Sequence, residues 1–121
     1  MSKLRVLIAD DEDGIRESLK LILEREYEVT AVSNGQDAWD RLSRDGFDLA
    51  VLDIKMPKLD GMEIIRRAKQ HKIATPILVL TAYQSVEVAK EAVKLGAIDY
   101  IPKPFDRDVI VQAIQDIVAK R

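Results

Sequence analysis

The sequence predicts an α/β fold, a three-layer sandwich in which a doubly wound, five-stranded parallel sheet lies between helices. Two observations predict it. Short runs of Leu, Val and Ile alternate with amphipathic helical stretches five times, and the connections between them are short. Such strict alternation implies right-handed crossovers and a parallel sheet. Several of the runs are apolar throughout, as expected when helices cover both faces of the sheet.

The first two strand–helix units are the most regular. Residues 4–9 (LRVLIA) are predicted as a strand, and residues 15–26 (IRESLKLILERE) as a helix whose apolar side chains share one face. Residues 27–32 (YEVTAV) form the second predicted strand, and residues 36–45 (QDAWDRLSRD) form the second helix. Asn34 stands where an N-terminal cap of that helix is expected.

The third and fourth units contain the most apolar strands. Residues 47–53 (FDLAVLD) and 76–81 (PILVLT) have the composition of strands buried on both faces. Helices are predicted after them at residues 62–70 (MEIIRRAKQ) and 85–95 (SVEVAKEAVKL), the second of which Ser85 would cap.

The fifth unit has the shortest predicted strand. Residues 99–101 (DYI) are predicted as the strand, PKPFD as a loop, and residues 107–121 as the last helix. Asp106 is expected to cap this helix, and Gly96 is expected to end the preceding helix in a left-handed conformation.

Composition limits the possible functions. A chain of 121 residues with 47% hydrophobic and 33% charged residues is expected to form one domain spanning residues 1–121. It contains no cysteine, which excludes disulfides and thiolate chemistry, and it has no apolar run long enough for a membrane span or signal peptide. These features predict a cytoplasmic protein. The net charge of −2 gives little reason to expect direct nucleic-acid binding.

Polar residues follow four of the predicted strands at the same end. In doubly wound sheets, ligands bind where the carboxyl ends of the strands meet. The residues concerned are Asp10, Asp11, Asp53, Thr81 and Lys103. Each has a structural explanation by itself, as a helix cap, a turn residue, a β-branched strand residue or a solvated lysine. Their joint placement at matching strand ends favours a site.

These residue types suit Mg²⁺-assisted phosphoryl transfer. Adjacent carboxylates repel one another unless a cation neutralises them, and with His71 as the single histidine, a metal must be bound by oxygen, which favours Mg²⁺. A carboxylate can act as a nucleophile toward phosphorus when an ammonium and a hydroxyl stabilise the phosphoryl oxygens. The glycines are too widely spaced for dinucleotide or P-loop motifs, and Lys55 argues against a phosphatase that needs a second acid there.

Four segments together resemble the receiver domain of bacterial two-component response regulators. They are LIADDE at 7–12, LDIKMPKLDG at 52–61, LTAY at 80–83 and DYIPKPF at 99–105. The resemblance covers essentially the whole chain and implies a flavodoxin-like fold with strand order 2-1-3-4-5. It also implies that Asp53 accepts a phosphoryl group from a phosphohistidine on a sensor histidine kinase or phosphotransfer protein.

The resemblance implies the roles of the other site residues. Asp11 and Asp53 would bind Mg²⁺ directly, Asp10 through water, and Lys55 through its backbone carbonyl. Lys103 would pair with the phosphoryl oxygens, and the Lys103–Pro104 bond would be cis, as X-Pro bonds permit.

The resemblance also implies a conformational switch. Thr81 would move toward the phosphoryl group and Tyr100 would turn into the vacated space, changing the surface of the fourth helix, fifth strand and fifth helix. Lys55 and Tyr83 would tune the lifetime of the aspartyl phosphate. Gly61 would supply backbone freedom in the turn before the third helix.

Three functional hypotheses follow. The leading one is a phosphorylation-dependent signalling module, not an enzyme with external turnover, that controls a downstream effector domain or protein. The alternatives are a pseudo-receiver acting as a constitutive interaction domain and a Mg²⁺-dependent phosphohydrolase, which the missing second acid disfavours. Residues 81–106 resemble receivers of enhancer-binding transcription activators and also single-domain phosphorelay intermediates. A phosphorylation-linked homodimer stays open, and no membrane partner is expected.

Overall fold

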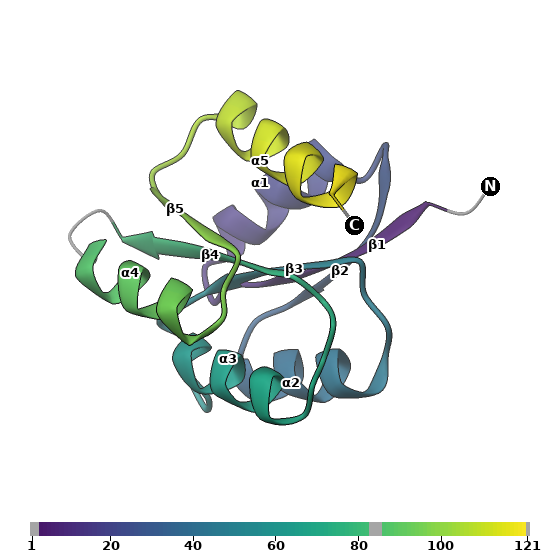
Figure 1. The fold of residues 1–121 in the computed structure, drawn as a ribbon. Helices are drawn as coiled ribbons and strands as arrows, with labels where there is room; N and C mark the ends of the chain where they lie inside the picture. The colour runs from purple at the N-terminus through teal and green to yellow at the C-terminus, as the bar shows by residue number, and fades with distance from the viewer. Residues whose placement is uncertain (1–2, 83–85, 121) are drawn as a thin grey trace.

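The computed structural model describes residues 3–82 and 86–120 and shows a central sheet between two helical layers (Figure 1). The strands are β1 (Leu4–Ala9), β2 (Tyr27–Val32), β3 (Leu49–Asp53), β4 (Ile77–Ala82) and β5 (Asp99–Lys103). The helices are α1 (Asp13–Leu23), α2 (Gly35–Arg44), α3 (Gly61–Gln70), α4 (Val86–Leu95) and α5 (Arg107–Ala119). All strand pairs are parallel, in the order β2-β1-β3-β4-β5, so the predicted fold class and strand order are confirmed.

The central strand β3 divides the core into two halves. Its five residues are all buried, and its side chains alternate between the two faces. Leu49 and Val51 pack with α1 and α5, whereas Ala50 and Leu52 pack with α2, α3 and α4. Figure 1 shows the same division, with α1 and α5 on one face of the sheet and the other three helices on the opposite face. Tight packing on both sides makes β3 a rigid support for its last residue, Asp53.

Strand β5 is longer than predicted. It includes Pro102 and Lys103, which the sequence analysis assigned to a loop. β5 is an edge strand of the sheet, and an edge position tolerates a proline because its missing N–H need not pair with a neighbouring strand. The register pairs Thr81 with Pro102 and Ala82 with Lys103, which brings Lys103 level with the end of β4.

Helix capping agrees with the predictions only in part. The side chain of Asn34 accepts a hydrogen bond from the backbone N–H of Asp37 at 2.9 Å, as predicted. Asp106 occupies the predicted N-cap position of α5, but its side chain makes no capping hydrogen bond. Asp60 caps α3 through the backbone N–H of Glu63 at 2.9 Å, which the sequence analysis did not predict. The predicted cap Ser85 lies outside the described residues.

Two glycines hold special positions for different reasons. Gly96 has φ +135° and its N–H donates to the carbonyl of Ala92, so the predicted helix end is confirmed. Gly61 is not in the left-handed region. A Cβ at that position would lie 2.7 Å from the carbonyl oxygen of Asp53. Close approach to the end of β3, and not backbone freedom, is therefore what requires glycine at residue 61.

Candidate functional site

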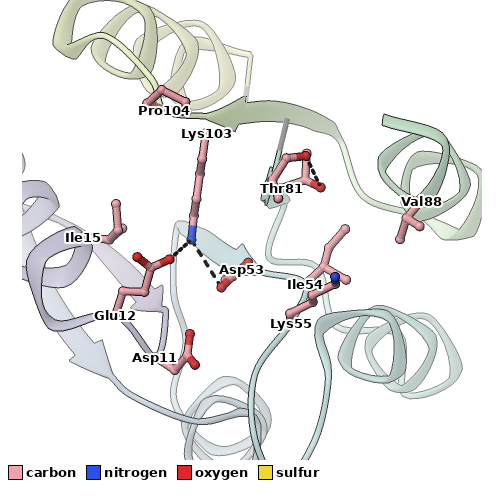
Figure 2. A pocket seen from close by; sticks show the side chains of 11 residues that line it. Asp11, Glu12, Ile15, Asp53, Ile54, Lys55, Thr81, Val88, Lys103 and Pro104 are labelled. Carbon is pink, nitrogen blue, oxygen red and sulfur yellow. Dashed lines mark hydrogen bonds and ion pairs between the residues drawn. The ribbon is translucent and has the colours of Figure 1, made fainter. Parts of the chain in front are cut away.

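The predicted site residues meet at the carboxyl ends of the strands. Asp10 follows β1, Asp53 ends β3, Thr81 lies near the end of β4, and Lys103 ends β5. Figure 2 shows the Lys103 side chain pointing toward the Asp53 carboxylate. Both side chains line a cavity of about 580 Å³. The cavity is lined by Asp11, Glu12, Ile15, Asp53, Ile54, Lys55, Thr81, Ala82, Val88, Lys103 and Pro104.

Three carboxylates form an acidic cluster on one side of this cavity. Oxygen atoms of Asp10, Asp11 and Asp53 all lie within 4.8 Å of one another. Asp10 is fully buried and Asp53 is 6% exposed, whereas Asp11 faces solvent. Such a set of oxygens repels itself, but it can bind a hard divalent cation and leave positions for water. The donor set therefore fits Mg²⁺.

Lys103 supplies the positive charge of the site. Its Nζ lies 2.7 Å from Asp10 Oδ2, 3.2 Å from Glu12 Oε1 and 3.3 Å from Asp53 Oδ2. The buried Oδ2 of Asp10 meets the ammonium as an ion pair, while Oδ1 accepts the backbone N–H of Glu12 at 2.9 Å. The Lys103–Pro104 peptide bond is cis, as the resemblance implied.

Burial and charge shift the pKa values of both central groups. Burial, and then the negative charge of Asp10, raises the pKa of Asp53, although the Lys103 ammonium and the backbone N–H of Lys55 oppose this rise. Burial by itself lowers the pKa of Lys103. The close contact with Asp10 and the charges of Asp10 and Asp53 outweigh this effect, so the pKa of Lys103 lies above its ordinary value. The ammonium thus only partly compensates the acidic cluster.

Sequence comparison decides the family. The sequence profile described as the response regulator receiver domain matches residues 6–115, which includes every strand end of the site. The chain belongs to this family. Receiver domains are the signalling domains of response regulators in two-component systems, and the acidic cluster lies where the family motifs predicted it.

Curated relatives of this receiver domain are longer regulators. It is 37% identical over 112 residues to the regulatory protein AtoC of Escherichia coli (strain K12), covering 92% of this chain and 24% of AtoC. It is 40% identical over 109 residues to the transcriptional regulatory protein SrrA of Staphylococcus aureus (strain NCTC 8325 / PS 47), covering 88% of this chain and 45% of SrrA. The chain thus spans less than half the length of these relatives.

Solved structures have the same fold. A receiver domain of the Francisella response regulator 1452 superposes with a TM-score of 0.91 at 29% identity, covering 98% of each chain. Full-length FixJ from B. japonicum superposes with a TM-score of 0.91 at 34% identity, covering 99% of this chain and 60% of FixJ.

The predicted switch residues lie on neighbouring strands of this receiver domain. Thr81 is 1% exposed, and its hydroxyl donates to the carbonyl of Ala82 at 3.4 Å. Tyr100 is half-buried and packs against the core beneath α2, α3 and α4. Of the two predicted lifetime residues, Lys55 is exposed at the cavity, and Tyr83 lies outside the described residues.

Two site residues were missed by the sequence analysis. Glu12 lies at the N-cap of α1 and contacts Lys103, 91 positions further along the chain. Arg16 donates from its guanidinium to the backbone carbonyl of Asp10 at 2.7 Å and forms an ion pair with Asp13. The DDED run places acids near the first strand end, but no local pattern indicates which acid reaches Lys103.

Proposed function

We propose that this receiver domain accepts a phosphoryl group on Asp53 from a phosphohistidine of a sensor histidine kinase or phosphotransfer protein in the cytoplasm. The observation that carries the proposal is the position of the Asp53 carboxylate, 3.3 Å from the Lys103 ammonium and beside two further acids. That arrangement pairs a nucleophilic carboxylate with positive charge on the side where phosphoryl oxygens would lie.

Each residue has a defined part in the transfer. An oxygen of Asp53 forms a bond to phosphorus as the phosphorus–nitrogen bond of the donor breaks, and the imidazole keeps the electron pair and takes up a proton. The Lys103 ammonium pairs with a phosphoryl oxygen, and the Thr81 hydroxyl donates to another.

Magnesium belongs to the proposed reaction. Asp10, Asp11, Asp53 and the backbone carbonyl of Lys55 are the groups that would hold it, with Asp10 acting through water. When bound, Mg²⁺ neutralises negative charge on the carboxylates and on the phosphoryl oxygens. The ion pair of 2.7 Å between Asp10 and Lys103 holds the ammonium beside Asp53.

The proposed output is a change of surface. Movement of Thr81 toward the phosphoryl group vacates space beside it, and Tyr100 turns inward to fill that space. The surface formed by α4, β5 and α5 then changes, and a downstream effector domain or protein recognises the changed surface. The relatives support such an output, since AtoC is named a regulatory protein and SrrA a transcriptional regulatory protein. Lys55 and Tyr83 would set the lifetime by controlling access of water to the acyl phosphate.

Mass spectrometry of the intact protein after incubation with acetyl phosphate tests this function. We expect the wild-type protein to gain the mass of one phosphoryl group in the presence of Mg²⁺, and chelation to abolish the gain. Asp53→Asn should not gain this mass, whereas the matched variant Asp48→Asn, at the other end of β3, should react normally. Equal labelling of Asp53→Asn would refute the assignment.

Two other outcomes would identify the alternatives. A wild-type protein that binds neither Mg²⁺ nor beryllofluoride would be a pseudo-receiver that acts as a constitutive interaction domain. Multiple turnover on a small phosphate ester would indicate a phosphohydrolase. We expect neither, because Asp53 and Lys103 line one cavity and the carboxylates of Asp10 and Asp11 lie beside Asp53.

Among the described residues, none of the helices combines the length and apolar character needed to cross a membrane.

A further inference from the structure

Lys103 is already in contact with three carboxylates before any phosphoryl group arrives. Its Nζ lies 2.7, 3.2 and 3.3 Å from the carboxylates of Asp10, Glu12 and Asp53, and the contact with Glu12 is a hydrogen bond. Phosphorylation bonds an oxygen of Asp53 to phosphorus, so the Asp53 contact passes to the phosphoryl group, and the phosphoryl oxygens then compete with Asp10 and Glu12 for the ammonium.

The three partners differ in how easily they are released. Of the two partners that stay ionised once Asp53 is bonded to phosphorus, Asp10 has a side chain that is 0% exposed, so losing the ammonium would leave a buried charge without its partner. The side chain of Glu12 is 63% exposed and would be released into water. Figure 2 shows Glu12 beside the Lys103 ammonium, next to Ile15 and separate from the acidic side chain of Asp11.

We propose that Glu12 is a positioning residue that holds Lys103 in the unphosphorylated receiver and is exchanged for a phosphoryl oxygen when Asp53 is phosphorylated. This inference rests on the proposed function of Asp53. Glu12 competes with the phosphoryl group for one donor of Lys103, so it slows phosphorylation and weakens binding of a phosphoryl mimic. No covalent bond to Glu12 forms or breaks in this exchange.

A pair of glutamate substitutions tests the exchange. Glu12→Gln removes the competing charge, and Glu17→Gln makes the same chemical change at an exposed position further along α1. With saturating Mg²⁺, we expect Glu12→Gln to raise the second-order rate constant for phosphorylation by acetyl phosphate about two- to fivefold. This is the effect expected from losing one partly exposed ion pair. Glu17→Gln should stay near the wild-type rate. An equal effect of both variants, or a slower Glu12→Gln, would overturn the inference.

Binding of beryllofluoride shows whether Glu12 acts through Lys103. We expect Glu12→Gln to tighten beryllofluoride binding, measured by calorimetry in Mg²⁺, by a similar factor of about two to five. The same substitution in a Lys103→Met background should change the affinity by less than a factor of about 1.5, because the shared partner is gone. A full effect without Lys103 would refute the exchange. If Lys103→Met does not fold, the affinities of Glu12→Gln and Glu17→Gln decide the matter.

The outcomes separate this inference from the proposed function. If Asp53→Asn is labelled as well as the wild-type protein, the proposed function fails. If labelling requires Asp53 but Glu12→Gln and Glu17→Gln behave alike, the function stands and the role of Glu12 is refuted.

Discussion

Aspartates flank β3, with Asp48 directly before its first residue and Asp53 as its last, and the surroundings of the two carboxylates are opposite in kind. At the amino end, Asp48 Oδ2 accepts the backbone N–H of Arg5 at 2.7 Å, and the N–H of Asp48 donates to the carbonyl of Arg5 at 2.8 Å. At the carboxyl end, Asp53 lies against Asp10 and Asp11, and burial and the charge of Asp10 raise its pKa. Asp48 therefore makes favourable hydrogen bonds with the backbone of Arg5, whereas the fold holds Asp53 beside two carboxylates that repel it.

The cations at the two ends differ in the same way. The Arg5 guanidinium donates to the carbonyl of Gly46 at 2.7 Å and lies over the ring of Phe47. Lys103 instead contacts three carboxylates, one of them fully buried. The charge imbalance at the carboxyl end indicates where a protein has given up stability for a ligand site.

The largest effect should come from removing the cation at each end. Without Mg²⁺, we expect Lys103→Met to lower the free energy of unfolding by about 3 kcal/mol, because the buried Asp10 loses its partner. Arg5→Met should lower it by less than about 1 kcal/mol. Urea unfolding measures both. Similar losses of unfolding free energy in the two variants would contradict the difference proposed between the two ends of β3.

The same substitution at the two aspartates should change the free energy of unfolding in opposite directions. In the absence of Mg²⁺, Asp53→Asn should raise the free energy of unfolding by about 1–2 kcal/mol, because it removes one charge of a buried, repelling set. Asp48→Asn should lower it by about 0.5–1 kcal/mol, since it weakens a charge-assisted hydrogen bond to Arg5. Thermal and urea unfolding test both variants. A loss of stability in Asp53→Asn would contradict the account.

The last prediction is that the gain in stability of Asp53→Asn depends on pH. Because the pKa of Asp53 is raised in the folded state, the folded protein keeps this proton to a higher pH than the unfolded chain does. The contribution of Asp53 to stability therefore falls as the pH rises from the unfolded pKa through the folded pKa. The gain in Asp53→Asn should be largest near pH 7.5 and should shrink toward about pH 4. Parallel unfolding series of the two proteins in chelator give this difference, and a gain that does not change with pH would argue against a raised pKa.

Much of the fold was predictable because it follows from local patterns. The bounds of β1 and β2 were predicted correctly, since Leu, Val and Ile runs end at clear turn residues. The end of β5 was not, because Pro102 and Lys103 are unusual strand residues that only the edge position accommodates. The missing cap bond of Asp106 depends on a side-chain conformation that the residue type does not determine.

Only the site residues that lie at the carboxyl ends of the strands could be predicted from the sequence. Asp10, Asp53, Thr81 and Lys103 were placed together because parallel strands end at one edge of the sheet. The contact of Glu12 with Lys103 joins a loop after β1 to the last residue of β5, and it depends on how two distant elements pack. The requirement for glycine at residue 61 was likewise predicted for the wrong reason. The carbonyl of Asp53, which excludes a side chain there, belongs to another segment of the chain.

The most direct test of the central claim identifies the residue that carries the phosphoryl group. Borohydride reduces an acyl phosphate of aspartate to homoserine, which peptide mass mapping locates after treatment with acetyl phosphate. The account predicts homoserine at position 53, only when Mg²⁺ is present. Homoserine at Asp10, Asp11 or Asp48, or its formation at position 53 without Mg²⁺, would contradict it.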